Sequence, residues 1–136
     1  MQKQYLHQAK GIKVKTIKVE EATPIQLNWL VAKCEGLKCD VPAYADRPWV
    51  RVTDPCGLQY VCPDYSTNWA HGGPLKVKKK IVSGPSIDGR FFAFIRTPHK
   101  QEKTPISSGD TELIAAMRCV VVRHYGKEVE VPNSLI

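Results

Sequence analysis

The sequence predicts one α+β domain, in which two main helices pack on a small, mostly antiparallel sheet. The length of 136 residues is enough for one hydrophobic core. Two segments place apolar residues at helical spacing, and several short apolar runs are bounded by turn residues. These runs do not alternate with helices as they do in proteins with a parallel sheet. We therefore expect the helices to cover an antiparallel sheet.

The first part of the chain is predicted to form an extension, an edge strand and a helix. Residues 1–11 are polar and precede a domain that spans 12–136. The segment 12–19, IKVKTIKV, mixes β-branched residues with lysines, whose charges discourage pairing between sheets. Thr23 and Pro24 are typical of a helix start, because Thr caps a helix and Pro suits its first position. The helix face and its glycine stop are Leu27, Leu30, Val31, Cys34 and Gly36.

A β-hairpin is predicted in the middle of the chain. Its strands cover 49–53 and 58–62, and the residues DPCG at 54–57 form its turn. Further turns are expected at 83–85, SGP, and at 88–89, DG. The hairpin and these turns supply the antiparallel part of the fold.

The C-terminal part is predicted to hold a buried strand, a loop, the second helix and a last strand. The apolar run FFAFI at 91–95 fits a buried strand, and the polar segment 97–109 fits a loop. Asp110 is the expected N-cap of a helix over about 110–125, and Gly126 is its expected stop. The predicted face of this helix consists of Leu113, Met117, Val120, Val121 and His124. The alternating residues 128–132 are predicted to form the last strand.

The charge favours a polyanionic partner. The chain carries 20 Lys and Arg against 13 Asp and Glu, a net charge of +7. Such a charge suits nucleotides, nucleic acid or acidic proteins. The lysine-rich run KVKKK at 76–80 is interpreted as the solvated face of a strand or loop.

The composition predicts a protein of a reducing compartment. No apolar run approaches the ~20 residues of a membrane span, and the first residues lack the apolar core of a signal peptide. Five cysteines without such a signal indicate free thiols in the cytoplasm. Their spacing does not fit a zinc site, so Cys34, Cys62 and Cys119 are expected to be small buried hydrophobes. No metal or cofactor is expected.

The stretch 65–75, YSTNWAHGGPL, is the candidate functional segment. It joins two aromatic rings, three small polar side chains and a histidine to Gly-Gly-Pro. We interpret it as a loop, in which Gly72 and Gly73 adopt angles forbidden to other residues and Pro74 sets the exit direction. The alternative is a structural loop that packs Trp69 beneath itself.

Three segments resemble the NinX-like family, small accessory proteins of tailed phages. They begin at Leu27-Asn28-Trp29, at Tyr65-Ser66-Thr67 and at Leu113, and together they extend over most of the chain. The resemblance implies a phage-encoded protein in the infected bacterial cytoplasm and one NinX-like domain over 12–136. It implies no reaction. Members of the family commonly have aspartate where this chain has Asn28 and Asn68.

Two functions fit these residues. In the first, the protein captures a nucleotide-like or other anionic small molecule, with aromatic rings stacking on it, glycine N–H groups holding it and a forked arginine gripping its phosphate. In the second, a basic surface at 76–80 docks on a host protein or nucleic acid. Self-association into a homo-oligomer is compatible with both. The candidate ligand-binding residues are Tyr65, Ser66, Thr67, Asn68, Trp69, His71, Gly72, Gly73 and Arg118.

An enzyme is less favoured. The chain has no Gly-x-Ser-x-Gly nucleophile elbow, Walker loop or His-Glu-x-x-His motif. His71 is the side chain of the candidate segment that titrates near neutral pH, so a small hydrolase would have to use it. No catalytic residue is assigned.

Overall fold

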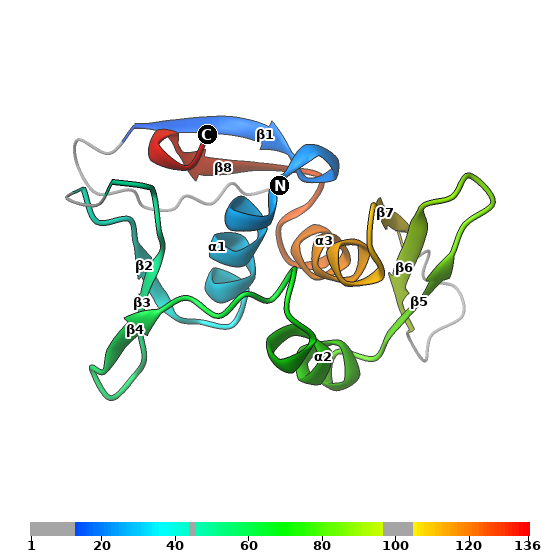
Figure 1. Ribbon diagram of the computed structural model, residues 1–136, viewed down its shortest axis with the longest axis horizontal. Helices are drawn as coiled ribbons and strands as arrows, with labels where there is room; N and C mark the ends of the chain where they lie inside the picture. Colours follow the sequence, from blue (N-terminus) through cyan, green and yellow to red (C-terminus); the bar gives the residue numbers. More distant parts are fainter. Residues whose placement is uncertain (1–12, 44–45, 97–104) are drawn as a thin grey trace.

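Two helices, α1 (Pro24–Cys34) and α3 (Glu112–Tyr125), form the centre of the fold. The computed structural model describes residues 13–43, 46–96 and 105–136. Around the helices lie three small antiparallel sheets with the strand orders β1-β8, β2-β3-β4 and β5-β6-β7 (Figure 1). The α+β class is confirmed, although three separate sheets take the place of the single sheet expected.

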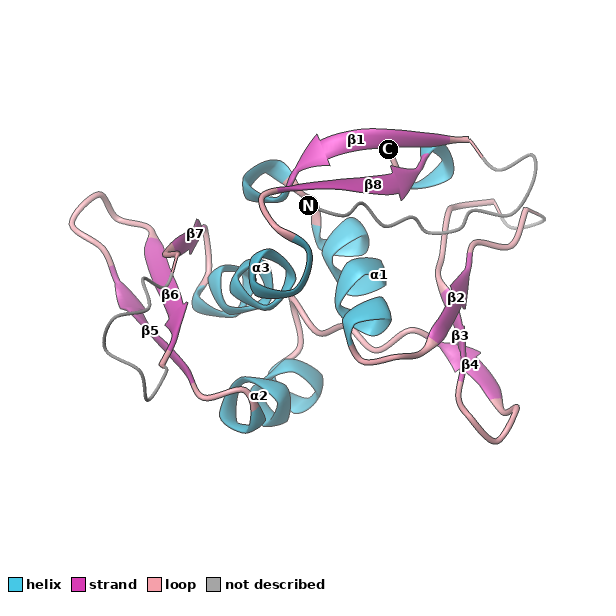
Figure 2. Cartoon of the chain, turned by 180° about the vertical axis from the view of Figure 1, so that it is seen from behind, coloured by secondary structure: helices cyan, strands magenta, loops and turns pink. Residues whose placement is uncertain are grey.

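The three α-helices are separated along the chain by the groups of strands β2–β4 and β5–β7. Figure 2 shows the same elements from behind. The β1-β8 ribbon lies along one side of the helix pair, and the other two sheets lie at opposite ends of the molecule. The bounds are β1 (Val14–Lys18), η1 (Val19–Glu21), β2 (Lys38–Asp40), β3 (Arg51–Thr53), β4 (Gln59–Val61), α2 (Trp69–Lys78), β5 (Ile81–Pro85), β6 (Phe91–Ile95), β7 (Ser107–Gly109), β8 (Glu128–Pro132) and η2 (Asn133–Leu135).

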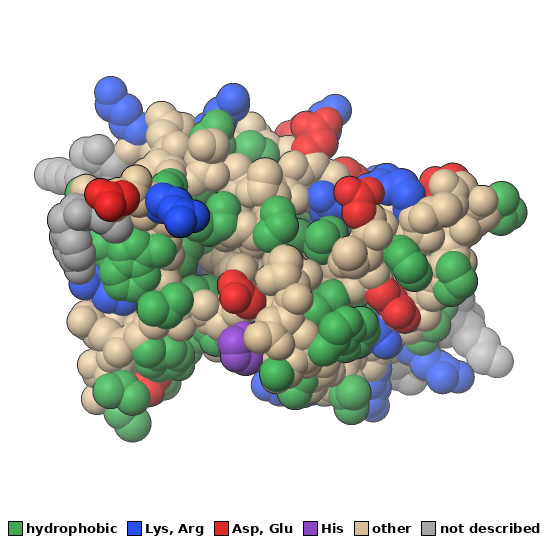
Figure 3. Space-filling model, in the orientation of Figure 1, with side chains coloured by type: hydrophobic (Ala, Val, Ile, Leu, Met, Phe, Trp, Pro, Cys, Tyr) green, Lys and Arg blue, Asp and Glu red, His purple; other side chains and the backbone are tan. Residues whose placement is uncertain are grey.

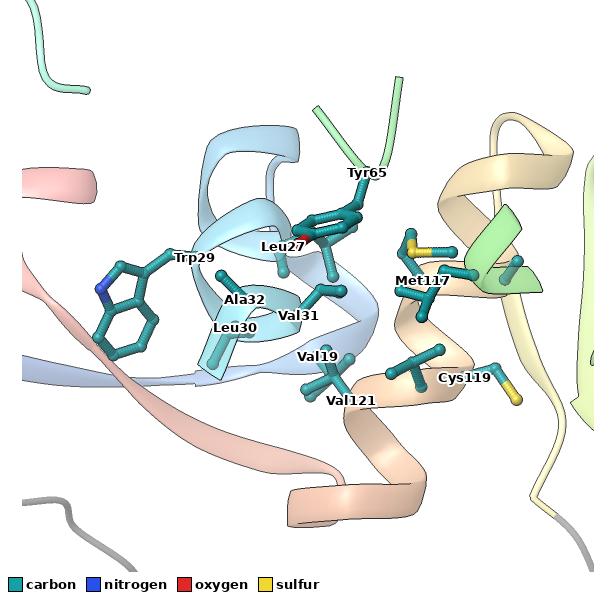
Figure 4. Close-up of a cluster of buried hydrophobic side chains, with 14 of the residues drawn as sticks. Val19, Leu27, Trp29, Leu30, Val31, Ala32, Tyr65, Met117, Cys119 and Val121 are labelled. Carbon is teal, nitrogen blue, oxygen red and sulfur yellow. The ribbon is translucent and has the colours of Figure 1, made fainter. Parts of the chain in front are cut away.

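The hydrophobic core lies mainly between α1 and α3. Figure 4 shows Tyr65, Leu27 and Met117 together at one end of this cluster, while the Trp29 ring points away from it on the far side of α1. Seven of the residues that the helical spacing placed on the two helix faces are buried, which confirms the predicted core between the helices, whereas Cys34 is only partly buried and His124 is exposed. The buried ones are Leu27, Leu30, Val31, Leu113, Met117, Val120 and Val121.

Local hydrogen bonds fix the start of both central helices. The Thr23 N–H donates to Gln26 Oε1 over 2.9 Å, and Gln26 Nε2 donates to the Leu135 carbonyl over 2.9 Å. The cap of α3 is Thr111, whose Oγ1 accepts from the Ile114 N–H over 3.1 Å. The predicted cap Asp110 is therefore one residue too early, and its carboxylate instead pairs with Arg90 at 3.2 Å.

The predicted glycine stops are confirmed at both helices, because Gly36 and Gly126 have φ of +82° and +96°. The hairpin is confirmed as β3 and β4 around a turn held by Asp54. Its Oδ1 accepts from the Cys56 and Leu58 N–H groups over 2.9 and 3.0 Å. The alternating run in the last segment is strand β8, antiparallel to β1, with Val14 opposite Pro132.

Two segments that looked like turns or loops are strands. Residues 83–85 belong to β5, which pairs with β6 from Ile81 opposite Ile95 to Pro85 opposite Phe91. Residues 107–109 form β7 on the other side of β6. In both cases the apolar strand β6 supplies the partner, so pairing prevails over local turn propensity. The rest of the predicted loop, 97–104, and the predicted extension 1–11 lie outside the described residues.

The five cysteines are free thiols. Cys62 and Cys119 are buried, whereas Cys34 is only partly buried and Cys56 is exposed. Burial raises the pKa of the thiols to about 12 at Cys34 and Cys62 and to about 11 at Cys119. These thiols are therefore protonated and unreactive near neutral pH.

Candidate functional site

The stretch 65–75 is a turn followed by a helix, not a single loop. Helix α2 begins at Trp69 and continues to Lys78, so Gly72, Gly73 and Pro74 lie within it. The interpretation of this stretch as a loop, with Gly72 and Gly73 in unusual backbone angles and Pro74 setting the exit direction, is therefore wrong. Pro74 lacks the N–H that would bond the Ala70 carbonyl, but both residues are exposed and water can reach that carbonyl.

The cap of α2 explains why a helix forms here. Asn68 Oδ1 accepts from the Ala70 N–H over 2.9 Å, as a good N-cap side chain does. The Asn68 carbonyl then accepts from the His71 and Gly72 N–H groups, both over 2.9 Å. Since these N–H groups are bonded within the helix, Gly72 does not form the anion-holding backbone nest that the sequence suggested.

Gly72 is required by close packing and not by its backbone angles. A Cβ atom at this position would lie 2.1 Å from the Tyr65 carbonyl oxygen and 2.8 Å from Leu113 Cδ1. At Gly73 the nearest atom to such a Cβ would be Trp69 Cε3, at 3.4 Å. Helix α2 is therefore pressed against the Tyr65 turn and α3 at Gly72, while the Trp69 ring lies across Gly73.

The turn before α2 is anchored to α1 through Asn28. Its Oδ1 accepts from the Ser66 N–H over 3.0 Å and from the Ser66 hydroxyl over 2.8 Å. Its Nδ2 donates to Asp64 Oδ1 over 3.2 Å. Ser66 is fully buried and the Tyr65 ring lies in the core, where burial raises the pKa of its hydroxyl. Tyr65 and Ser66 thus hold the fold together and offer nothing to solvent.

His71 is exposed and has a defined hydrogen-bond partner. Its Nδ1 accepts from the Asp64 N–H over 3.0 Å. The neutral ring therefore carries its proton on Nε2 and presents an N–H donor to solvent. This tautomer does not suit a general base at Nε2, so the geometry gives no support to the hydrolase alternative.

Arg118 serves a different part of the molecule. Its guanidinium is buried, with Nη1 donating to the Ser108 carbonyl over 2.9 Å and Nη2 donating to the Ala22 carbonyl over 3.0 Å. Burial lowers the pKa of this group. Its hydrogen bonds join α3 to β7 and to the residue after η1, whereas the candidate turn is held by Asn28. Arg118 is thus not brought together with the candidate segment.

The outer side of α2 is apolar and open to solvent. Trp69 and Val77 lie two turns apart and are 53% and 78% exposed. Ala70 and Pro74 between them are also exposed. We call these four residues, with Gly73, the α2 face. Val77 was not among the predicted site residues, although Trp69, Gly73 and Val77 are spaced four residues apart in the sequence.

The lysine-rich run 76–80 was predicted to be a strand or loop, but its first three residues form the last turn of α2. Lys79 is the C-cap of the helix, and Lys80 follows it. Lys78 and Lys79 approach the carboxylate of Glu35 at 3.4 and 3.0 Å. No ion pair joins Lys76 or Lys80 to another described residue. Within this lysine-rich run, the positive charge without an ion pair therefore lies at these two positions.

A second apolar surface lies on the β3–β4 hairpin. Leu58 and Val61 are 64% and 66% exposed there, and Tyr60 is partly exposed. Figure 3 shows hydrophobic side chains over the hairpin and over α2, with a notch in the molecular surface between them. Thr67 and Asn68 of the candidate segment are both exposed, immediately before α2.

Residues 13–43, 46–96 and 105–136 contain no group of three or more His, Cys, Asp or Glu that could hold a metal ion. No helix among them is long and apolar enough to cross a membrane.

The comparison with known families gives one match. The model of the family described as Bacteriophage P22, NinX matches residues 18–124, which is most of the chain. The chain belongs to the NinX family. The resemblance inferred from the three segments is confirmed, and the protein is a phage NinX-like protein. No curated protein matches the chain.

The part of the chain matched to NinX contains both α1 with its Asn28 anchor and all of α2. It stops before β8. The Asn28–Ser66 anchor and the α2 face therefore both belong to the NinX-like region.

Proposed function

We propose that this NinX-family protein is a phage-encoded interaction protein that docks on an acidic protein in the infected bacterial cytoplasm. The α2 face is the contact surface. The observation that carries the proposal is the exposure of Trp69 and Val77 on one side of a helix whose other side is fixed in the fold. This develops the second of the two functions that the sequence suggested.

The anchoring of α2 makes its exposed side a suitable docking element. Leu75 is buried and Gly72 is pressed against the Tyr65 turn, so the helix is held from beneath. Binding then requires little ordering of the surface, which lowers the entropic cost of association. An exposed tryptophan on such a support is the side-chain type that most often dominates a protein interface.

The charge next to the α2 face selects an acidic partner. Lys76 lies in the last turn of α2 and Lys80 directly after its C-cap, and the whole chain carries a net charge of +7. Positive groups at the rim of an apolar contact speed association with a negatively charged surface and reject basic ones. A partner with an apolar stripe beside acidic residues therefore fits this surface.

The capture of an anionic small molecule has less support. Trp69 keeps a ring that can stack on a base, but Arg118 is occupied by two backbone carbonyls and the glycine N–H groups lie in a helix. An anion at Trp69 would thus lack the hydrogen bonds that were predicted from Arg118 and from the glycine N–H groups. Nucleotide binding is accordingly treated as an outcome of the test.

The test compares proteins retained from phage-infected cells by four forms of the chain. They are the wild type, Trp69→Ala, Val77→Asp and the control Ile87→Asp, in which an isolated exposed residue of the β5–β6 turn receives the same charge. We expect an acidic protein to be retained by the wild type and Ile87→Asp and to be lost, by tenfold or more, with the two α2 variants.

The retained protein is then purified and titrated into the wild type and into Trp69→Ala, and the changes in tryptophan fluorescence of the two are compared. Equal retention by all four forms would show that the α2 face is not the interface. Saturable binding of a nucleotide, weakened by Trp69→Ala, would instead support capture of a small molecule.

A further inference from the structure

The strand β4 leaves one edge without a partner among the described residues. It pairs with β3 alone, with Tyr60 opposite Val52. The Asp54 N–H donates to the Leu58 carbonyl over 3.0 Å, and the Cys62 N–H donates to the Val50 carbonyl over 2.9 Å. Since ladder bonds alternate along an antiparallel strand, Leu58, Tyr60 and Cys62 turn their backbone groups toward β3.

The intervening residues Gln59 and Val61 therefore turn their N–H and C=O groups away from β3. These four groups lie in line along the open edge of β4. A second strand placed there would find two donors and two acceptors at the spacing of an antiparallel ladder.

The open edge of β4 carries neither charged residues nor proline, two of the features by which proteins prevent such pairing. The edge strand β1 carries Lys15 and Lys18, and the edge strand β2 carries Lys38 and Asp40. In contrast, the residues LQYVC at 58–62 include no charge and no proline. Charged residues and proline are the usual protection of an edge.

We infer that β4 pairs antiparallel with β4 of a second copy of this chain, so that two three-stranded sheets join into one. A two-fold axis at Tyr60 places Gln59 of each copy opposite Val61 of the other. All four open backbone groups of both copies are then used, so the edge is complementary to itself. No like charges meet at the contact, because the strand has none.

The register decides which side chains meet. Tyr60 lies opposite Tyr60 of the second copy in a pair without direct hydrogen bonds, where Cβ atoms are about 4.5–5.5 Å apart. The two Gln59 residues are diagonal neighbours, at about 7–8 Å. The exposed side chains of Leu58 and Val61 lie at the same contact and lose water as it forms.

The dimer is expected to be weak. Strands of three residues bury far less than the ~1,600 Å² of a standard interface. The net charge of +7 on each copy also opposes association, and salt should relieve part of that repulsion. The dimer should therefore form at high protein concentration and strengthen as salt rises.

Disulfide trapping tests the register. The background variant is Cys56→Ser, which removes the exposed native thiol. On this background, Tyr60→Cys should give a disulfide-linked dimer under mild oxidation, because the two thiols face one another. The matched variant Gln59→Cys, on the same strand, should give at least fivefold less linked dimer. Equal trapping of the two variants, or none with Tyr60→Cys, would overturn the inference.

Sedimentation equilibrium tests the contact without a crosslink. Up to about 1 mM, where weak interfaces of this size associate, the mean mass of the wild type should rise from 15.3 kDa toward twice that value. Val61→Lys should stay monomeric, because the two introduced lysines would be diagonal neighbours across the contact and would repel each other. Val77→Asp should dimerise like the wild type, since the contact does not involve the α2 face. A wild type that stays monomeric throughout would refute the pairing.

Discussion

Tyr65 and Trp69 lie four residues apart, and the structure uses their aromatic rings in opposite ways. Tyr65 is part of the core, and the adjacent Ser66 is tied to Asn28 by two hydrogen bonds. Trp69 is half exposed and lies across Gly73 on the outer side of α2. The difference shows that one family-like segment contains both an anchor and a presented surface. Its polar residues serve the anchor more than any ligand.

Truncation of the buried Leu113 side chain, which packs against Gly72, should have the largest effect on the free energy of unfolding. Leu113 is buried and touches the position of Gly72, so Leu113→Ala should lower the free energy of unfolding by about 2–5 kcal/mol. Urea unfolding followed by circular dichroism measures this change. Val77→Ala, on the exposed side, serves as the control and should leave stability within about 0.5 kcal/mol. Stability like that of the wild type in Leu113→Ala would remove this residue from the core.

The two adjacent glycines distinguish the anchored side of α2 from the open side. Gly72→Ala drives a Cβ into the Tyr65 carbonyl and should cost about 3 kcal/mol, at the upper end of overpacking effects. Gly73→Ala meets only ordinary contact and should stabilise the helix by about 0.5–1 kcal/mol. Thermal unfolding of both variants measures the contrast. Similar midpoints would mean that α2 is not pressed against the turn.

Asn28 in the anchor and Asn68 at the start of α2 make a second pair. Asn28→Asp removes the donor to Asp64 and sets two carboxylates face to face, which should cost about 1–3 kcal/mol. Asn68→Asp keeps the acceptor for the Ala70 N–H and adds negative charge at a helix start, so it should gain about 0.3–1 kcal/mol or leave stability unchanged. Chemical unfolding at neutral pH and low salt compares them. A stable Asn28→Asp protein would contradict the assigned contact between Asn28 Nδ2 and Asp64.

The smallest effect on stability is expected at the presented surface. Trp69→Ala should change the free energy of unfolding by no more than about 0.5 kcal/mol, because the ring is half exposed. Its effect should appear in partner binding instead. Differential scanning calorimetry on the free protein measures the first quantity. A loss of several kcal/mol would mean that Trp69 belongs to the anchor and not to the α2 face.

The central helices were predictable because their signals are local. Leu27 and Val31, like Leu113 and Met117, stand one turn apart, and the glycine after each helix supplies its stop. The sequence misled at Pro74, whose usual effect on helices is outweighed by the Asn68 cap and the buried contact of Gly72. The hydrogen bond of the Asn68 cap and the close packing at Gly72 both depend on neighbouring residues, which the helix propensities of Gly and Pro alone do not take into account.

The role of Arg118 could not be predicted from its neighbours in sequence. An arginine on a helix can face water, a phosphate or the interior with the same local pattern. Its burial depends on the Ser108 and Ala22 carbonyls, and Ala22 is 96 positions away in the chain. The strand at 83–85 was missed for a similar reason, because its partner β6 defines it. Long-range partners decide both cases.

The pairing of β1 with β8 has a consequence for synthesis of the chain. Val14 lies opposite Pro132, and Gln26 bonds the Leu135 carbonyl, so β1 and α1 need residues made more than 100 positions later. At about 5–20 residues per second, a ribosome needs roughly 5–20 s between these segments. During that interval α1 exists without α3 and without the final strand. Completion of the native structure therefore waits until β8 and η2 have been made, and the nascent chain is exposed to chaperones and proteases of the cell until then.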